Sequence, residues 1–286
     1  MKTLSAPSLA HLQSETTTFA TFWKITRKDG VVQGFTSHVT DVLYSGVTYK
    51  AASGILPTNV QTSSGKGVDN VSIMGIVSSP DIAEADLLVG RYDDAKVEVF
   101  ILNYEDTTQD RIVLISGFIG EVKLGRKQFE AEVRSLTQRT AQYVGKACSP
   151  LCRVKNLGDS ECSVSLGPFT FSGAVSVAIG KSQFQTNSAG IVGKPFGYFA
   201  YGTLTWTSGL NSGKAVEVRT HDTSSPMKFT LAEALAFPPQ VGDTFSVVAG
   251  CDRTSNSCRT KFGNIVNFRG EPFIPGADFV LRKVSE

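Results

Sequence analysis

The sequence has little of what many binding proteins and enzymes depend on. It has three histidines, two tryptophans and three methionines, and it has no block of consecutive lysines and arginines. The formal net charge is only +2, so we expect no sequence-specific binding of nucleic acid. No apolar run is long enough to cross a bilayer, and the first residues lack the apolar segment of a secretory signal. We therefore expect a protein without a membrane anchor, made in a reducing cytoplasm.

No group of residues indicates catalysis. His11, His38 and His221 lie outside any metalloprotease or cysteine-peptidase motif. The Gly-Lys-Gly at 65–67 lacks the spacing of a phosphate-binding loop, and the Asp-Asp at 93–94 is typical of a solvated turn. We therefore predict no catalytic residue and a protein that is not an enzyme.

Glycine and β-branched residues are plentiful, with short alternating apolar runs between turn signals, a pattern typical of β structure. In the first half this pattern predicts a hairpin across 28–30, a second across 45–46, and strands at 69–77, 95–104, 111–124 and 127–136. In the second half it predicts strands at 169–179, 198–206, 214–221 and 226–235. Helical spacing predicts short helices over 80–88, ending near Gly90, and over 136–145.

All five cysteines lie in the second half, at Cys148, Cys152, Cys162, Cys251 and Cys258. Two close pairs on either side of a folded insertion can bring four thiolates to one point. Four thiolates select zinc or an iron–sulfur cluster. No pair has the two-residue spacing of a zinc knuckle, which favours a cluster. Buried free thiols are the plain alternative, while disulfides are disfavoured in a reducing compartment. Spacing therefore predicts a metal and leaves its identity open.

Cationic residues stand next to these cysteines. A cluster on four thiolates carries negative charge, which neighbouring cations and backbone N–H groups stabilise. An ordinary solvated surface would contain the same residue types. The cations in question are Arg153, Lys155, Arg253, Arg259 and Lys261.

The chain resembles a phage tail-hub family that includes the hub of gene transfer agents. Three segments of the first half carry the resemblance: RKDGVVQGFTSHVTDVLYSGVTY, GRYDDAKVEVFILNY and GFIGEVKLGRKQFEAEVRSL. The second half adds SPLCRVKNLGDSECSV and CDRTSNSCRTKFGNIVNFRGEPFIPG. The last two are the most specific, and together the segments cover about residues 19–278.

The resemblance implies a siphophage tail-tip or baseplate hub, similar in role to the lambda-type tail-tip protein. It implies a 4Fe–4S cluster on Cys152, Cys162, Cys251 and Cys258, whereas Cys148 stands where the family has a small residue. It also implies a homotrimeric ring in the virion, assembled in the host cytoplasm, between a distal tail protein ring and a central fibre or spike. Such a hub would close the tail tube, attach the fibre and provide a channel for DNA.

The C-terminal motif can also be interpreted physically. Asn264 and Asn267 can satisfy backbone groups in an irregular loop. Phe262, Phe268 and Phe273 would shield a cluster from solvent. A generic packed loop would explain the same residues without a metal.

We therefore predict a mainly β protein with two domains. Residues 1–147 form a tube-like β hub domain, and 148–286 form a cysteine-ligated domain with a small inserted β-barrel or sandwich at about 165–248. Two alternatives come from other functional classes. One is a tail-associated cell-wall hydrolase; the other is a carbohydrate-binding tail module with a structural zinc, using Trp206 and Tyr198 as platforms.

Overall fold

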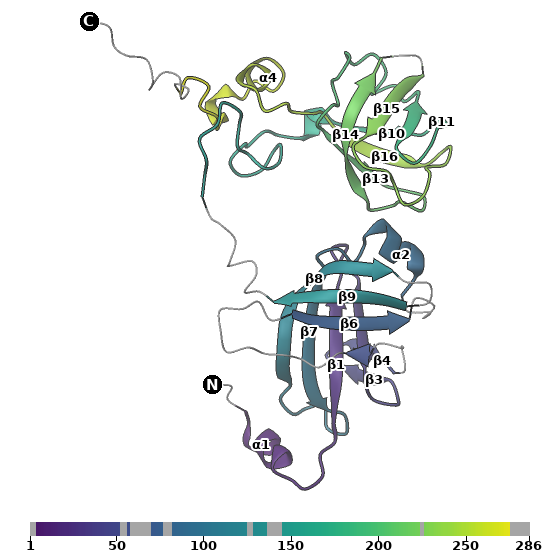
Figure 1. Cartoon of the computed structure of the whole chain (residues 1–286), viewed down its shortest axis with the longest axis vertical. Helices are drawn as coiled ribbons and strands as arrows, with labels where there is room; N and C mark the ends of the chain where they lie inside the picture. The colour runs from purple at the N-terminus through teal and green to yellow at the C-terminus, as the bar shows by residue number, and fades with distance from the viewer. Residues whose placement is uncertain are drawn as a thin grey trace, which may run out of the picture. The chain divides into compact units, whose positions relative to one another are not determined.

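The structure, a computed structural model, describes residues 4–51, 56–57, 70–76, 82–124, 128–135, 145–223 and 226–274. The chain divides into two compact units, Met1–Tyr143 and Val144–Glu286. Each unit contains one large sheet and few helices, which confirms the mainly β fold (Figure 1). The sequence-based domain boundary, between 147 and 148, lies a few residues further along the chain.

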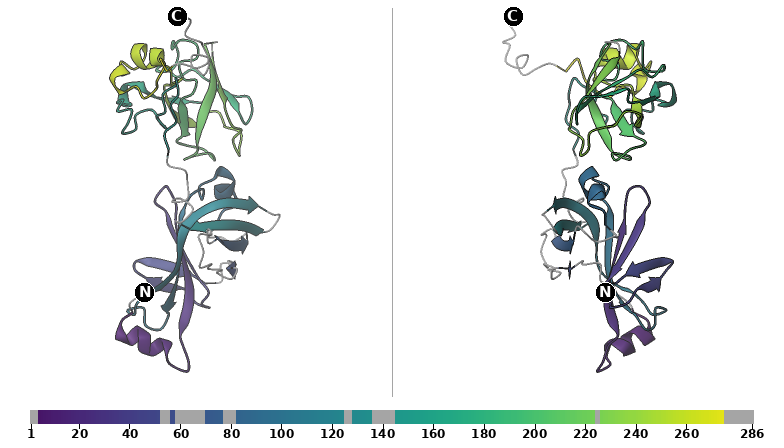
Figure 2. Two further views of the ribbon diagram at one scale, coloured as in Figure 1. Left: turned by 60° about the vertical axis from the view of Figure 1, so that its left-hand side comes forward. Right: turned by 90° about the vertical axis from the view of Figure 1, so that its right-hand side faces the viewer.

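The first unit is built on a nine-stranded sheet with the order β3-β4-β2-β1-β7-β8-β9-β6-β5. The pairs are antiparallel, except that β2 and β4 are parallel. The sheet is strongly curved, and β8 bends where its register with β9 shifts (Figure 2). The strands are β1 Phe19–Thr26, β2 Val32–Thr36, β3 Val42–Tyr44, β4 Val47–Lys50, β5 Leu56–Pro57, β6 Asn70–Ile76, β7 Lys96–Asn103, β8 Ile112–Leu124 and β9 Gln128–Ser135.

The two predicted hairpins are confirmed. β1 pairs with β2 across a turn in which Gly30 has a φ of 87°. β3 pairs with β4 across Ser45 and Gly46, whose φ angles are 50° and 77°. Positive φ at both central residues gives the turn whose twist matches that of the flanking strands, which is why a Gly-containing pair connects them.

Both faces of this sheet are covered. Trp23 and Ile25 pack on one face together with Leu87 of α2 (Glu84–Val89). Phe22, next to Trp23 in β1, lies in the other apolar cluster with Phe100. Successive side chains of a strand point to opposite faces, so a run without polar alternation fits a strand buried on both sides.

The two helices of this unit are short. The predicted helix before Gly90 is confirmed as α2, and Gly90 ends it with a φ of 80°. α1 (Ala6–Leu12), about two turns long, was not predicted. The carboxylate of Asp110 accepts the N–H of Ser5 at 2.6 Å and so fixes the start of α1. The helix predicted over 136–145 lies almost wholly outside the described residues.

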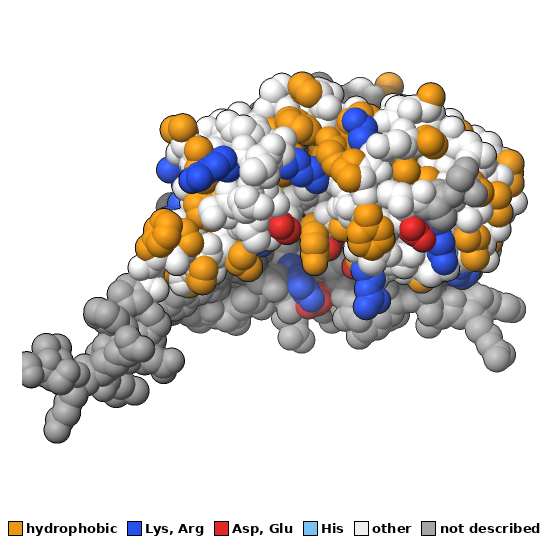
Figure 3. Space-filling view, turned by 90° about the horizontal axis from the view of Figure 1, so that it is seen from above, with side chains coloured by type: hydrophobic (Ala, Val, Ile, Leu, Met, Phe, Trp, Pro, Cys, Tyr) orange, Lys and Arg blue, Asp and Glu red, His pale blue; other side chains and the backbone are white. Residues whose placement is uncertain are grey.

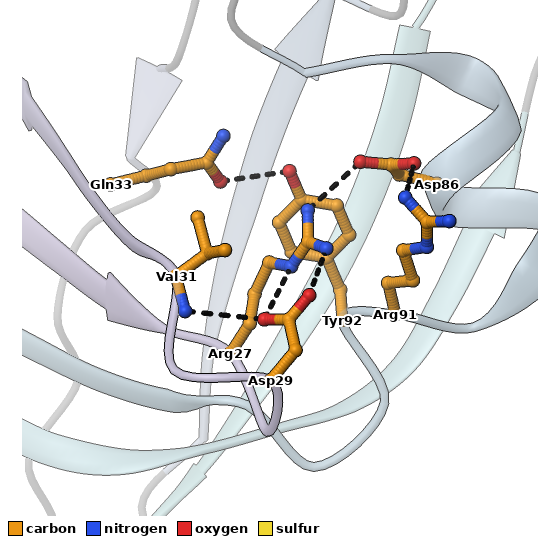
Figure 4. Close-up of polar contacts among 7 residues, drawn as sticks. All are labelled: Arg27, Asp29, Val31, Gln33, Asp86, Arg91 and Tyr92. Carbon is orange, nitrogen blue, oxygen red and sulfur yellow. Dashed lines mark hydrogen bonds and ion pairs between the residues drawn. The ribbon is translucent and has the colours of Figure 1, made fainter. Parts of the chain in front are cut away.

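A buried arginine connects the first hairpin to α2 (Figure 4). The guanidinium of Arg27 forms ion pairs with Asp29 and with Asp86, the latter at 2.8 Å. Arg91 donates to the other carboxylate oxygen of Asp86 at 2.7 Å. Arg27 lowers the pKa of Asp29, as expected for a carboxylate that accepts from a cation. The network holds the first hairpin and the α2 segment together.

The second unit contains a small barrel of seven strands, ordered β10-β16-β13-β14-β15-β12-β11. All its pairs are antiparallel. β10 pairs with β16, and the chain then continues into β11, which pairs with β12, so the sheet closes on itself. The strands are β10 Thr170–Ala174, β11 Val177–Ala178, β12 Gln183–Thr186, β13 Thr203–Trp206, β14 Ala215–Asp222, β15 Met227–Leu231 and β16 Thr244–Val248.

Most strands of this barrel were predicted, but two were missed. β12 and β16 are short and lie between turn-forming residues, so neither gave a clear alternating run. The strand predicted over 198–206 begins only at Thr203, because turns occupy the residues before it and Tyr201 has a φ of 65°. The barrel interior is rich in aromatic rings, with Phe184, Phe229 and Phe245 in mutual contact.

The remaining two segments of the second unit, 145–166 and 250–274, form what we call the cysteine lobe. They contain α4 (Ser255–Thr260) and the 3₁₀ turn η2 (Ile265–Asn267) and no strand in their described residues. A second 3₁₀ turn, η1 (Gly167–Phe169), leads from the lobe into β10. The segments lie side by side, since the N–H of Cys152 donates to the carbonyl of Arg253 at 2.8 Å.

On the face that Figure 3 draws, cations and apolar side chains are intermixed. Figure 3 shows lysine and arginine side chains scattered singly among apolar and uncharged ones on one face. Within the described ranges, no helix has the length and apolar character needed to span a membrane.

Candidate metal centre

The four predicted ligand cysteines line one cavity of about 370 Å³ in the second unit. Cys162 and Cys258 are buried, and Cys152 and Cys251 are half-buried. The structure thus brings together two cysteine pairs that are about ninety residues apart in the sequence. Cys148 is exposed and is not among the residues that line this cavity.

A tight turn places Cys162. The carboxylate of Asp159 accepts the N–H groups of Glu161 at 3.0 Å and of Cys162 at 2.8 Å. These hydrogen bonds lower the pKa of Asp159, so the carboxylate stays charged and the turn stays closed at neutral pH. Gly158 precedes it with a φ of 82°, a conformation that favours glycine.

A helix cap places Cys258. The hydroxyl of Thr254 accepts the N–H of Ser257 at 3.2 Å at the start of α4. Asp252 in turn accepts the N–H of Thr254 at 3.0 Å. Because Cys258 lies in this single helical turn, the cap fixes its direction relative to Cys251.

Each sulfur of the cavity has a polar neighbour. The N–H of Arg269 donates to the sulfur of Cys152 at 3.4 Å. The backbone N–H of Arg253 donates to the sulfur of Cys251. The side-chain amide of Asn264 lies 3.8 Å from the sulfur of Cys162, and the thiol of Cys258 donates to the carbonyl oxygen of Asn264 at 3.2 Å.

Burial raises the pKa of the Cys251 and Cys258 thiols. For Cys258, the negative charges of Cys152, Cys251 and Cys162 add to this rise, which reflects how close the four sulfurs are. Buried thiols with N–H donors at sulfur have the chemistry of an iron–sulfur ligand set, because a bound metal removes the thiol protons and the donors stabilise the thiolates. The donor set therefore fits such a group.

The four thiols line one cavity without forming a closed site for a single metal ion. Within the part of the chain that the structure describes, no three His, Cys, Asp or Glu side chains are placed to hold such an ion.

Two of the predicted cations line the cavity. Lys155 and Arg253 both face it, and neither forms an ion pair with another described residue. Arg153 instead pairs with Glu271. Arg259 is exposed on α4. The sequence alone could not show which of the five cations lie at the cavity.

Lys261 joins the cysteine lobe to the barrel. Its ammonium donates to the carbonyl oxygens of Tyr198 at 2.5 Å and Gly250 at 2.7 Å, and it lies 4.3 Å from the centre of the Tyr198 ring. Burial lowers the pKa of Lys261. A Cβ at Gly250 would overlap the backbone oxygen of Ala200, so only glycine lets the residue before Cys251 pass so close to the barrel.

The three phenylalanines predicted to shield the site lie in different surroundings. Phe262 lines the cavity and packs against Phe169 with ring centres 5.0 Å apart. Phe268 is half-buried beside Gly270. Phe273 is 94% exposed and covers nothing.

The three histidines make structural contacts. His11 accepts the N–H of Thr18 at 3.0 Å. His38 stacks on Tyr104 with ring centres 4.1 Å apart. His221 is fully buried in the barrel.

The carbohydrate-binding alternative used Trp206 as a sugar-binding platform, and the buried position of Trp206 contradicts that role. The side chain is 1% exposed in the barrel core. Tyr198 is half-buried and lies beneath Lys194 and Lys261. The alternation of strand β13 turns Trp206 inward, and the sequence analysis did not use this alternation to place it.

The sequence analysis missed the residues that position the cysteines. Thr254 is of a residue type preferred at the N-cap of a helix, and it could have been found from the run of capping residues at 252–257. Asp159 could have been found as an Asx turn before Cys162. The role of Asn264 could be expected only in outline, because its partner, Cys162, is distant in sequence.

The chain was compared with known protein families and solved structures. Residues 5–165 match the family of the baseplate hub protein, N-terminal attachment domain. The chain belongs to the phage baseplate hub family. Residues 197–278 match the phage conserved hypothetical protein BR0599 family, so the first cysteine pair lies in one match and the second pair in the other. No curated protein matches the chain.

A solved structure gives the same assignment for this hub protein. A chain of the virion of a native gene transfer agent particle is 32% identical to it, with a TM-score of 0.88. The likeness covers 99% of this chain and 97% of that one. The predicted family resemblance and the virion tail location are therefore confirmed: the hub protein is a structural component of a virion.

Proposed function

We propose that this hub protein binds a 4Fe–4S cluster through Cys152, Cys162, Cys251 and Cys258, and that the cluster stabilises the C-terminal unit. The observation that carries the proposal is the cavity lined by all four thiols. When bound, such a cluster supplies four strong bonds between chain segments that are otherwise weakly connected.

The cysteine spacing favours a cluster over zinc, because neither pair has the two-residue spacing of a zinc knuckle. A cluster keeps its thiolates around a core of several atoms, whereas one zinc ion draws them together. The N–H donors of Arg253 and Arg269 face two of the sulfurs, and Lys155 adds an unpaired cation at the cavity wall. These groups stabilise an anionic cluster.

Metal analysis tests the cofactor. Protein purified without oxygen should be brown and contain about four irons and four acid-labile sulfides per chain, the composition of a 4Fe–4S cluster. Colourless protein with stoichiometric zinc would overturn the iron assignment and keep the site. Protein without any metal, after expression with ample iron and cysteine, would overturn the site itself.

The assembly is also part of the proposal. We infer a homotrimeric ring that lies between a distal tail protein ring and a central fibre or spike, closes the tail tube, attaches the fibre and provides a channel for DNA. Membership of the baseplate hub family and likeness to a chain of a virion particle support this. Such a ring needs head-to-tail interfaces that close.

Native mass spectrometry of the full chain tests the ring. A trimer whose mass does not change with dilution over the nanomolar to micromolar range is expected. A monomer throughout that range, both alone and mixed with the distal tail protein, would contradict it.

We propose a structural and not an enzymatic role. His11 and His38 hydrogen-bond the hydroxyls of Thr18 and Thr40, His221 contacts the sulfur of Met227, and none of the three belongs to a hydrolase motif. Peptidoglycan zymography should therefore show no clearing. Clearing that a single substitution outside the cysteines abolishes would favour the cell-wall hydrolase.

A further inference from the structure

We infer that Asn264 is the side chain that positions and tunes the cysteine site. This inference rests on the proposed function, because it concerns the group that the four thiols would hold. It goes beyond the ligands to a residue that does not itself bind metal.

Asn264 contacts both halves of the cysteine set. Its side-chain N–H donates to the carbonyl oxygen of Cys162 at 2.6 Å and lies 3.8 Å from the Cys162 sulfur. Its own carbonyl oxygen accepts from the thiol of Cys258 at 3.2 Å. The N–H of Asn264 donates to the carbonyl of Cys258 at 2.8 Å. One residue therefore connects the first cysteine pair to the second.

The orientation of the amide is fixed. The side-chain N–H of Asn267 donates to Oδ1 of Asn264 at 2.8 Å. With Oδ1 occupied as an acceptor, the NH₂ group of Asn264 faces Cys162. The neighbouring residue Gly263 has a φ of 61°, which turns the chain from α4 toward this position.

The donors to the other sulfurs differ in kind. Arg253 and Arg269 present backbone N–H groups to Cys251 and Cys152. A side-chain substitution does not remove those donors. At Cys162 the donor is a side chain, so Asn264 is where the hydrogen bonding of the site can be changed without breaking the backbone.

The physical consequence concerns both retention and reduction potential. A donor near sulfur stabilises the more electron-rich, reduced form of a cluster and so raises its midpoint potential. Loss of an outer residue of this kind typically weakens metal binding by about 10–100-fold. Asn264→Asp keeps the shape, removes the donor and adds a negative charge, whereas Asn264→Ala removes the whole amide.

The test uses the full-length chain purified without oxygen, with iron release to a chelator and the midpoint potential as readouts. We expect Asn264→Ala to release iron about 10–100-fold faster than the wild type, with a lower midpoint potential. Asn264→Asp should have the lowest potential of the three. Asn267→Ala should shift the potential in the same direction but less, because it frees the amide without removing it.

A matched control lies in the barrel. Asn211 is buried, and its amide donates to the carbonyl of Phe237 at 2.8 Å, away from the cysteines. Asn211→Asp should lower the melting temperature and leave the midpoint potential unchanged.

The outcomes separate the two claims. If the wild type carries the cluster and the variants at 264 and 267 keep its potential and iron release rate, the role of Asn264 is wrong and the proposed function stands. If the variants at 264 lose iron only in proportion to their loss of folded protein, with Asn267→Ala at the wild-type potential, Asn264 is merely structural. If the wild type carries no iron and no sulfide, the proposed function fails first.

Discussion

The barrel and the cysteine lobe are neighbours in one unit and are held together differently. Fourteen buried apolar residues form the core of the barrel. The cysteine lobe has a core of three buried residues, Val154, Cys162 and Val164. Seven antiparallel strands form the barrel, whereas the described part of the lobe contains one short helix, one 3₁₀ turn and loops.

The difference indicates where a cofactor is needed. Burial of apolar surface stabilises a fold by about 25 cal/mol per Å². A core of three residues cannot offset the conformational entropy of two ordered segments. In small regions of this kind a metal commonly supplies the missing stability. The barrel needs no such help, so the two regions should respond differently to the same treatments.

The largest expected effect is on the lobe. Cys258→Ser should abolish iron binding and destabilise the lobe by more than about 5 kcal/mol, since binding energy and folding energy are the same in such sites. Limited proteolysis should then cut within 145–166 and 250–274 and spare the barrel. Cys148→Ser is the matched control and should leave iron content unchanged, because Cys148 is exposed and away from the cavity.

The next effect is on the barrel. Phe229 is fully buried among Phe184, Phe199 and Phe245. Phe229→Ala should destabilise the barrel by about 3–5 kcal/mol. Denaturant unfolding followed by near-ultraviolet circular dichroism measures it. The exposed Phe196→Ala should cost almost nothing. Equal iron content in both variants below their melting temperatures would confirm that the barrel variants leave the cysteine site intact.

Acid should weaken the barrel in a defined window. Burial lowers the pKa of His221 to about 4 from its usual 6.5, and its Nδ1 has no hydrogen-bond partner among the described residues. Above pH 6.5 neither the folded nor the unfolded chain binds this proton. Between pH 6.5 and about 4 only the unfolded chain binds it, so the free energy of unfolding falls as the pH falls.

The total loss from this group should reach about 3 kcal/mol. Equilibrium unfolding at a series of pH values measures the slope. His221→Gln cannot take up the proton, so the slope in this window should flatten. An unchanged slope in that variant would show that other groups cause the acid sensitivity.

The smallest expected effect is again on the lobe. Thr254→Ala removes the cap of α4 and should cost about 1 kcal/mol. The change should appear as faster iron release, since α4 carries Cys258. Thr254→Ser keeps the hydroxyl and should behave like the wild type. If Thr254→Ala destabilised the barrel instead of the lobe, the claim that the two regions are held together differently would be contradicted.

The sequence predicted the barrel better than the lobe, for a physical reason. Strands such as β14 and β15 can be identified from the alternation of apolar and polar residues in the local sequence. The turn at Ser45 and Gly46 can likewise be identified from its own residue types. The lobe depends on contacts between distant segments, such as Asn264 with Cys162. The four cysteines could be grouped from spacing and family resemblance, whereas their hydrogen bonds could not.

Two aromatic residues were assigned wrong roles. Trp206 and Phe273 were both assigned a role from residue type alone. Their exposure is the reverse of what those roles require, since Trp206 is buried and Phe273 is exposed. Strand alternation decides the first, and the course of the chain after η2 decides the second.

Hydrogen exchange of the full chain, with and without its metal, tests the central claim most directly. We expect amides in 145–166 and 250–274 to be protected in the loaded protein and to exchange quickly after chelation and oxidation remove the metal. The strands β10 to β16 should keep their protection in both states. A lobe that stays equally protected without metal would contradict the account.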